Sequence, residues 1–316
     1  GWAKFGWGKI YGQWICGAVL VGYESQRFEP LKLLSVMERL RLTTFCAPPT
    51  VYRFLIKEDL SRFDLSSIHH ASTAGEPLNP VVYDSFRDAT GIPICEGFGQ
   101  SESSVLFANF AWFPVKPGST GKPSPLYALD LVDEDGKSCE DGVVGTIVVR
   151  GLDHFHPPGL FREYFRDPAS MAGSFTAGVY STGDTAWRDA DGYYWFVGRN
   201  DDVIKCSGYR IGPFEVESVL MTHPAVLECA ITAAPDPIRG QVVKATVVLS
   251  RGYSPTGDLA RELQEHVKKA TAPYKYPRLV DFVTELPKTT SGKIRRTLIR
   301  GRDQNPVLGG GDEGKI

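Results

Sequence analysis

Residues 198–217, GRNDDVIKCSGYRIGPFEVE, separate two parts of the chain that differ in their sequence patterns. The apolar residues that end at Gly198 predict the end of a strand. Residues 214–221 predict the start of a helix, with Pro213 in its first turn. The connection between these elements is polar and contains several glycines. A solvated loop with surface ion pairs is its simplest interpretation, because exposed pairs are common and weak. The motifs in the rest of the chain favour a functional junction instead.

The composition is typical of a soluble globular protein. Of the 316 residues, 42% are hydrophobic and 23% are charged, which allows two domains, or one large and one small. The net charge of −2 gives no general attraction to nucleic acid or to an anionic membrane surface. No apolar run reaches the ~18 residues of a membrane-spanning helix. The sequence leaves the oligomeric state open, including a homo-oligomer.

The six cysteines are scattered, without a C-x-x-C pair. This pattern predicts free thiols in a reducing compartment, which would be the cytoplasm or, in a eukaryote, the mitochondrial matrix. The first 20 residues lack the features of a signal peptide. The chain opens on GWAKFGWGK without an initiator methionine, which we interpret as the interior of a longer protein.

The first hundred residues alternate between strand and helix patterns. Residues 12–23 predict a buried helix that passes into a strand. Further on, we expect strands over 43–49, 68–78 and 91–103, and helices over 28–42, 50–57 and 79–90. Three such alternations predict a parallel, doubly wound sheet of the α/β class, in which ligands bind beyond the carboxyl ends of the strands. The motifs STAGEPL (72–78) and EGFGQSE (96–102) lie at those ends.

The pattern changes after residue 111. Over 112–198, turn signals separate short apolar runs and predict an antiparallel, barrel-like subdomain. Beyond the junction, two strands within 225–250 and a helix over 258–270 predict a small α+β lid. The last eight residues, GGGDEGKI, contain little apolar material and predict a disordered tail.

Two short motifs carry groups suited to a nucleotide. In EGFGQSE, amides beside glycines can approach a phosphate or a base closely, and Glu102 is a candidate ligand for Mg²⁺. A polar strand-to-helix loop with Ser101 as the helix cap is the alternative. In YSTGD (180–184), the Asp184 carboxylate is suited to accept two hydrogen bonds from ribose hydroxyls. The alternative is an ordinary aspartate turn.

The motif PKTTSGKIRR (287–296) places Lys293 beside a glycine, but it lacks the full phosphate-loop pattern. A mobile lysine could neutralise charge on a transferring phosphoryl group, whereas the alternative is a solvated basic turn. The pair His154 and His156 could bind a metal, although the following prolines favour a loop.

Taken in this order, the five motifs resemble the adenylate-forming (AMP-binding) superfamily over nearly the whole chain. Longer stretches, including PDPIRGQVVKA and LQEHVKKATAPYKYPR, resemble medium-chain acyl-CoA synthetases of the butyrate–CoA ligase type. The resemblance implies the C-terminal portion of a large domain over 1–200, with the barrel-like subdomain at 112–198. A small mobile domain over 201–316 follows. The phosphate loop of the family has no counterpart in this sequence.

The reaction implied by the resemblance has two halves. A carboxylic acid reacts with ATP to give acyl-AMP and pyrophosphate, and coenzyme A then displaces AMP. ATP, Mg²⁺, coenzyme A and a small carboxylic acid would be the partners. Two alternatives stay open: an adenylation module that loads a carrier protein, and a nucleotide-binding fragment without catalysis.

In the large domain, the resemblance implies a nucleotide site. Its adenine pocket and the positions beside it would be Gly75, Glu76, Pro77, Glu96, Gly97 and Phe98. Gln100 and Ser101 would meet the phosphates of the nucleotide and the acyl-adenylate, and Glu102 would hold Mg²⁺. Asp184 and Arg199 would hold the ribose hydroxyls.

In the small domain, the resemblance implies that Arg210 faces the phosphate and that Lys293 bridges the attacking carboxylate and the α-phosphate. Asp201 would be the hinge on which this domain swings between the half-reactions. The pantetheine arm of coenzyme A and its nucleotide end would be bordered by Ser207, Gly208, Tyr209, Arg239 and Lys275.

Gly99 is expected at the floor of the acyl pocket, which acetate-specific relatives close with a tryptophan. A glycine leaves room for several methylenes, each worth about 0.8 kcal/mol when buried. Trp2, Phe5 and Trp7 are candidates for the apolar wall. The sequence therefore predicts a medium-length or branched acid.

Overall fold

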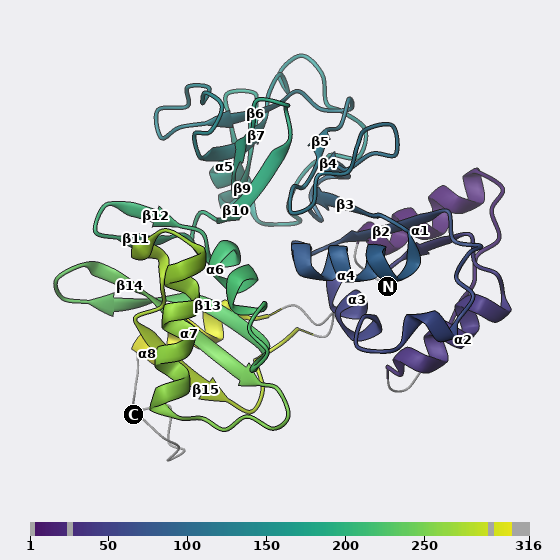
Figure 1. Ribbon diagram of the computed structural model, residues 1–316. Helices are drawn as coiled ribbons and strands as arrows, with labels where there is room; N and C mark the ends of the chain where they lie inside the picture. The colour runs from purple at the N-terminus through teal and green to yellow at the C-terminus, as the bar shows by residue number, and fades with distance from the viewer. Residues whose placement is uncertain (1–3, 24–27, 290–293, 305–316) are drawn as a thin grey trace. The chain divides into compact units, whose positions relative to one another are not determined.

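The computed structural model describes residues 4–23, 28–289 and 294–304 (Figure 1). The chain divides into two compact units, Gly1–Phe196 and Val197–Ile316. All six cysteines are free thiols, as their spacing predicts. No helix within the described ranges is long and apolar enough to cross a membrane. The expected tail, residues 309–316, lies outside the described residues.

The first unit begins with the expected parallel sheet. Three parallel strands, β1 (Thr44–Cys46), β2 (His70–Ala74) and β3 (Ile94–Gly99), are followed in the sheet by the antiparallel strands β4 (Val105–Ala108) and β5 (Lys122–Pro123). The helices between them are α2 (Pro30–Arg39), α3 (Pro49–Leu55), the 3₁₀ turn η1 (Leu60–Arg62) and α4 (Pro80–Thr90). Figure 1 shows α3 and α4 beside β2 and β3. The alternation predicted from the sequence is confirmed.

Local sequence explains where these helices begin. Each of α2, α3 and α4 has a proline in its first turn, where the missing N–H costs nothing. Asn79 caps α4 by accepting a hydrogen bond from the Val81 N–H at 2.8 Å. The helices then bury Leu34, Met37 and Phe86 in one apolar core with residues of β2 and β3. This core fixes the parallel strands and therefore the loops at their carboxyl ends.

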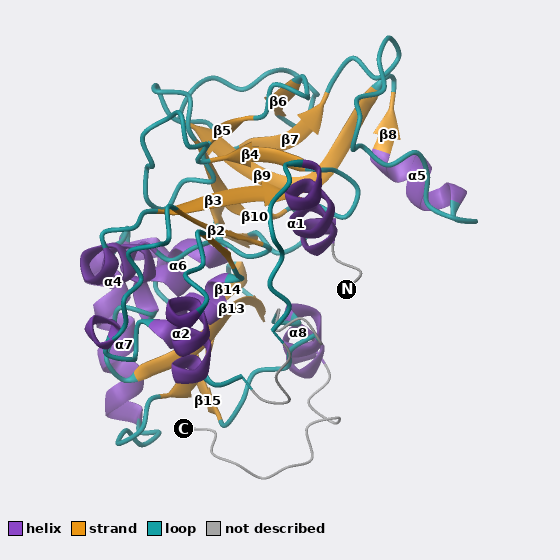
Figure 2. Ribbon diagram, turned by 90° about the vertical axis from the view of Figure 1, so that its right-hand side faces the viewer, coloured by secondary structure: helices purple, strands orange, loops and turns teal. Residues whose placement is uncertain are grey.

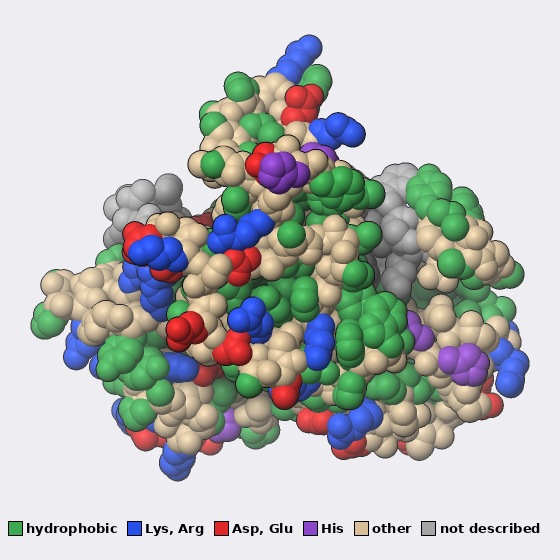
Figure 3. Space-filling view, turned by 90° about the horizontal axis from the view of Figure 1, so that it is seen from above, with side chains coloured by type: hydrophobic (Ala, Val, Ile, Leu, Met, Phe, Trp, Pro, Cys, Tyr) green, Lys and Arg blue, Asp and Glu red, His purple; other side chains and the backbone are tan. Residues whose placement is uncertain are grey.

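The prediction for residues 12–23 is wrong. The helix α1 (Lys4–Ile15) ends inside this segment, and the described residues 16–23 form no strand. The segment is also exposed: Ile15 and Val19 keep 86% and 91% of their surface accessible. Exposed apolar side chains are visible among the polar ones in Figure 3. An apolar run shows which surface favours burial, but only a neighbouring element can bury it, and within the described residues no strand pairs with this segment.

The second half of this unit is antiparallel, as expected. Its strands are β6 (Leu129–Val132), β7 (Gly145–Val149), β8 (Phe175–Thr176), β9 (Val179–Arg188) and β10 (Tyr194–Arg199), and a short helix α5 (Pro168–Ser174) precedes β8 (Figure 2). A bridge between Gly121 and Tyr194 joins this sheet to the first one. A common core with Leu106, Ile147 and Tyr180 fills the space between them. The two sheets therefore form the barrel-like arrangement that carries both EGFGQSE and YSTGD.

The second unit is an α+β domain built on one sheet. The strand order is β12 (Tyr209–Ile211), β11 (Ile204–Cys206), β14 (Gly240–Leu249) and β13 (Val226–Asp236), and β15 (Leu279–Val283) pairs with β14 in parallel. The other elements are α6 (Pro213–Leu220), α7 (Gly257–Ala270), the 3₁₀ turn η2 (Pro273–Lys275) and α8 (Arg296–Gln304). The sequence predicted β13, β14, α6 and α7. It missed β15 and the β11–β12 hairpin, because their strands are only three to five residues long.

A buried ion pair joins the two faces of this sheet. Val216 and Leu220 of α6 pack on one face, and Ile299 of α8 packs against Ala230 and Val248 on the other. At the edge strand β13, the Glu217 carboxylate accepts hydrogen bonds from Arg296 Nη2 at 2.7 and 2.8 Å. It also accepts the Ile231 N–H at 2.8 Å. The pair therefore connects the GYRIGPFEVE and PKTTSGKIRR motifs and covers a strand edge.

Substitution of this pair should destabilise the second unit strongly. In Glu217→Gln the acceptor for Ile231 remains, but the largely buried Arg296 charge loses its closest carboxylate and keeps only the weaker attraction of Asp202, which we expect to cost roughly 2–4 kcal/mol in unfolding free energy. The measurement is urea unfolding followed by circular dichroism. The control is Glu265→Gln on α7, whose side chain is 55% exposed, and it should change stability by less than about 0.5 kcal/mol. Equal stability of the two variants would contradict the prediction.

Candidate functional site

The Gln100 side chain brings two of the predicted motifs together. Its Nε2 donates a hydrogen bond to the Thr182 carbonyl at 2.8 Å and another to Asp184 Oδ2. Its Oε1 accepts the Tyr180 hydroxyl at 2.8 Å. EGFGQSE and YSTGD, about 80 residues apart in sequence, are therefore joined by one carboxamide. Asp184 is 5% exposed, so its carboxylate depends on such donors. The sequence predicted Gln100 and Asp184 separately but missed Tyr180 and Thr182 as partners.

The loop after β2 is held by two acidic side chains. Glu76 Oε1 accepts hydrogen bonds from the Thr50 N–H at 3.1 Å and the Thr50 hydroxyl at 2.6 Å, and it pairs with Arg53 at 3.3 Å. A carboxylate is favourable there because it meets free N–H groups at the start of α3. Glu96 Oε2 accepts the Leu78 N–H at 3.2 Å from the other side. Both acidic side chains, which were expected in or beside the adenine pocket, support the loop.

The rest of this loop is available to a ligand. Gly75 is exposed and has φ +100°, a conformation that L side chains rarely adopt, and Pro77 is half-buried. Gly97 and Phe98 are half-buried on β3, and the Phe98 ring lies 6.0 Å from that of Phe107, centroid to centroid. The structure therefore places the predicted adenine positions on two adjacent strand ends.

Ser101 and Glu102 form a turn between two strands. The Ser103 N–H bonds to the Gln100 carbonyl at 3.2 Å, and β4 follows, so the alternative of a strand-to-helix loop is wrong. Ser101 is exposed. Glu102 Oε1 accepts the Tyr164 hydroxyl at 3.0 Å.

A single half-buried carboxylate fits Mg²⁺ that is shared with nucleotide phosphates, because Mg²⁺ usually takes one or two carboxylates and keeps waters. Over the described ranges no group of three His, Cys, Asp or Glu side chains could hold a metal by itself. The protein would therefore supply Glu102, and the phosphates and waters would complete the coordination.

The local backbone gives a steric reason for the glycine at residue 99. A Cβ at this position would lie 2.4 Å from the Ser104 carbonyl oxygen, where the β3–β4 pairing shifts register. In this backbone geometry, any side chain at residue 99 would force the β3–β4 turn to shift, whatever the length of the acid. Gly97 differs, since a Cβ there would make only ordinary contacts at 3.8 Å or more.

Substitution of these two glycines by alanine should change the free energy of unfolding by different amounts. Gly99→Ala forces the β3–β4 turn to move, and we expect a loss of about 1–3 kcal/mol in unfolding free energy. Gly97→Ala should stay within about 1 kcal/mol of the wild type. Thermal unfolding of both variants is the measurement, and equal losses would contradict the steric argument. A change of acyl preference in Gly99→Trp is informative only if the turn is retained.

In the second unit, Ser207 and Gly208 form a tight hairpin turn. Their φ angles are +49° and +85°, and Cys206 pairs with Tyr209 across the turn. Two positive φ angles define the turn type that best matches twisted strands. A Cβ at Gly208 would meet nothing within 4 Å, so its conformation rather than its size requires glycine. The Ser207 N–H bonds to the Arg239 carbonyl at 3.4 Å, which brings three of the predicted coenzyme A residues together.

An exposed aromatic pair extends this hairpin. The rings of Tyr209 and Tyr274 stack with centroids 4.0 Å apart. Beside them, Lys275 Nζ donates hydrogen bonds to the two Glu215 oxygens at 2.6 and 2.7 Å. The surface of Ser207, Tyr209, Arg239, Tyr274 and Lys275 therefore offers two stacked rings to a ligand, while the Lys275 ammonium is held by Glu215. The sequence missed Tyr274, although it stands next to Lys275 in the APYKYPR stretch.

The segment around Asp201 is tied to α8. Arg199 Nε donates to Asp201 Oδ1 at 3.2 Å, and Arg300 Nη1 donates to the Asp201 carbonyl at 3.1 Å. Arg300 also pairs with Asp202. Arg210 lies on β12, opposite Lys205, and is exposed. The sequence missed Arg300, which follows the last motif by four residues.

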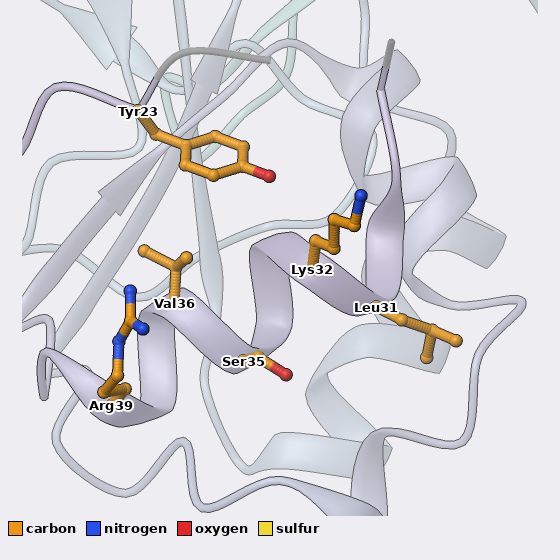
Figure 4. Close-up of a pocket in the computed structure, with 6 residues that line it drawn as sticks. All are labelled: Tyr23, Leu31, Lys32, Ser35, Val36 and Arg39. Atoms are coloured by element: carbon orange, nitrogen blue, oxygen red, sulfur yellow. The ribbon is translucent and has the colours of Figure 1, made fainter. Parts of the chain in front are cut away.

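Several predicted residues cannot be placed. Lys293 and Trp2 lie outside the described residues, and Phe5 and Trp7 belong to α1 but their side chains are outside the description. A separate depression of about 390 Å³ lies along α2. Figure 4 shows its Val36 and Lys32 side chains pointing toward Tyr23. None of the predicted site residues lines it.

Two family models match the chain. The model of the AMP-binding enzyme matches residues 2–165, and that of the AMP-binding enzyme C-terminal domain matches residues 215–293. The chain belongs to the AMP-binding enzyme family. The resemblance drawn from the five motifs is thereby confirmed.

Similar proteins include human acyl-coenzyme A synthetase ACSM3, mitochondrial, which is 46% identical over 309 residues. The uncharacterized acyl–CoA ligase YtcI of Bacillus subtilis is 47% identical over 305 residues. The alignments cover 97% and 96% of this chain but 53% and 57% of those proteins. The chain thus spans about half the length of the curated relatives that it matches.

Solved structures of the same fold include the anthranilate CoA ligase AuaEII in complex with anthranoyl-AMP, with a TM-score of 0.82 and 36% identity over 91% of this chain and 55% of that one. A benzoate CoA ligase from Burkholderia xenovorans gives a TM-score of 0.75 and 33% identity over 87% of this chain and 54% of that one. The predicted α/β fold, with its barrel-like part and small α+β domain, is confirmed.

Proposed function

We propose that this chain takes part in the ATP-dependent activation of a carboxylic acid and its transfer to coenzyme A. The observation that carries the proposal is the link through Gln100, which joins the glycine-rich loop after β3 to the buried Asp184 of β9. The names of the relatives support it, since they are acyl-coenzyme A synthetases and acyl–CoA ligases.

In the first half-reaction, a carboxylate oxygen attacks the α-phosphorus of ATP and the bond to pyrophosphate breaks. Gly75, Pro77 and the backbone of Gly97 would line the adenine, and Asp184 would accept the ribose hydroxyls. Glu102 would hold Mg²⁺, which when bound would neutralise negative charge on the phosphates. Arg210 and Lys293 would supply positive charge at the α-phosphate, where charge develops.

In the second half-reaction, the thiol sulfur of coenzyme A attacks the acyl carbon, the thiol loses its proton and AMP leaves. Ser207, Gly208 and Tyr209 would border the pantetheine arm. Arg239 and Lys275 would meet the phosphates at the nucleotide end, because cationic side chains bind phosphates through charge-assisted hydrogen bonds. Asp201 would act as the hinge between the two arrangements.

The acid is proposed to be a monocarboxylic acid of medium size, with fatty acids as the first candidates. Gly99 supports this only in part, since a side chain there would also displace the β3–β4 turn. The anthranilate and benzoate ligases of the same fold add ring acids to the candidates. A reducing compartment, either the cytoplasm or the mitochondrial matrix, is proposed from the six free thiols.

The test is mass-spectrometric detection of coenzyme A thioesters. The 316-residue chain is given ATP, Mg²⁺, coenzyme A and a set of straight-chain acids with benzoate and anthranilate. We expect thioester formation that Lys293→Ala reduces by at least 100-fold, which is the scale for a positioned transition-state charge. Lys269→Ala, an exposed lysine of α7, is the matched control and should retain the activity.

Binding of AMP without turnover would favour the nucleotide-binding alternative over catalysis by this chain alone. Transfer to a carrier-protein thiol, with none to free coenzyme A, would favour the carrier-loading module. Failure of a folded chain to bind AMP, ATP or coenzyme A would contradict the proposal altogether.

A further inference from the structure

Glu96 is buried within β3 (Ile94–Gly99) and connects two neighbouring segments. Glu96 is 5% exposed. Its Oε2 accepts a hydrogen bond from the Leu78 N–H of the STAGEPL loop at 3.2 Å. Its backbone carbonyl accepts the Asn109 N–H at 2.8 Å. One residue thus connects the loop after β2 with the segment after β4. The carboxyl group faces the protein interior and makes its only hydrogen bond, within the described residues, to Leu78.

The surroundings of this carboxyl are polar but uncharged. Thr73 is its register partner on β2, so the two side chains leave the sheet on the same face. The Thr73 hydroxyl is buried and has no hydrogen-bond partner in the described parts of the chain. The charged groups of the loop and of the helix behind it, Glu76 and Arg53, pair with each other. Across the described segments no charged side chain bonds to Glu96.

Burial without a compensating charge favours the protonated acid. It raises the pKa of Glu96 to about 8, and the hydrogen bond from Leu78 opposes this shift without overcoming it. At neutral pH the side chain is therefore mainly a neutral carboxylic acid. As a neutral acid, it can still accept the Leu78 N–H through its carbonyl oxygen.

We propose that neutral Glu96 is a positioning residue that holds the loop of residues 75–78 in its ligand-binding shape, and that its ionisation opens this loop. An unpaired carboxylate in this place is costly, and the chain can relieve the cost by letting water reach Glu96. The loop that moves away from Glu96 contains Gly75 and Pro77. Its opening would therefore weaken binding of the adenine ring. This inference rests on the proposed nucleotide site.

The direction of the pH dependence follows from linkage. Opening returns Glu96 to water, where its ordinary pKa of 4.5 applies, whereas in the closed loop the pKa is about 8. The closed loop therefore binds the proton more tightly. Its stability is fully present below about pH 4.5, falls as the pH rises toward 8, and then levels off.

Amide hydrogen exchange of Leu78 tests the loop directly. We expect the opening constant, corrected for the intrinsic exchange rate, to increase at least tenfold between pH 6 and pH 8 in the wild type. In Glu96→Gln, which keeps a carbonyl acceptor but cannot ionise, it should not change. The Val81 N–H is the control within the same chain, because it bonds to Asn79, which does not titrate.

AMP binding tests the consequence. The ratio of wild-type to Glu96→Gln dissociation constants cancels the titration of AMP itself, and we expect it to rise at least threefold from pH 6 to pH 8. Equal pH profiles in the two proteins, for exchange and for binding, would overturn the inference. If Glu96→Gln does not fold, a wild-type opening constant at Leu78 that is flat over this range would overturn it too.

The outcome can be separated from that of the proposed function. Absence of AMP binding at every pH in a folded wild type would count against the nucleotide site, whereas the Leu78 exchange profile would still decide whether Glu96 holds the loop. A pH-dependent opening that is absent in Glu96→Gln would support the positioning role of Glu96.

Discussion

The buried carboxylate of Asp184 needs hydrogen-bond donors, and the first unit is arranged so that Gln100 provides one. Gln100 follows directly after β3, the last of the parallel strands, whereas Asp184 lies within the long antiparallel strand β9. The hydrogen bond between them can form only if the two sheets are joined in the correct register. The Gly121–Tyr194 bridge and the shared aromatic core provide this register. The candidate nucleotide site is therefore a consequence of how two different sheets meet.

Acidic side chains in this region stabilise the backbone of the loops as well as lying close to the candidate ligand site. Glu76 satisfies the first turn of α3, and Glu96 satisfies the backbone of the loop in front of it. Both keep the loop after β2 in place from behind, so that Gly75 can face outward. The same principle holds in the second unit, where Glu217 supports the edge of β13 and anchors Arg296. A carboxylate in a motif can thus be essential without touching a substrate.

Different physical constraints explain why glycine occupies two of the motif positions. Gly99 avoids a collision with the Ser104 carbonyl, and Gly208 adopts a positive φ in a two-residue turn. Both requirements come from the protein backbone. A comparison of motifs alone would assign both glycines to ligand space, because a ligand and a tight turn select the same residue type.

The sequence by itself determined the family, the alternation of strands and helices, and the motifs that supply the candidate site. These properties depend on local patterns: prolines in first helical turns, apolar periodicity, and charged residues beside glycines. The pairing of Gln100 with Asp184, and of Glu217 with Arg296, was decided only by the tertiary structure. About 80 residues separate each pair, and no local pattern specifies which buried polar groups will satisfy each other. The exposure of residues 12–23 has the same cause, since burial depends on the elements that surround an apolar segment.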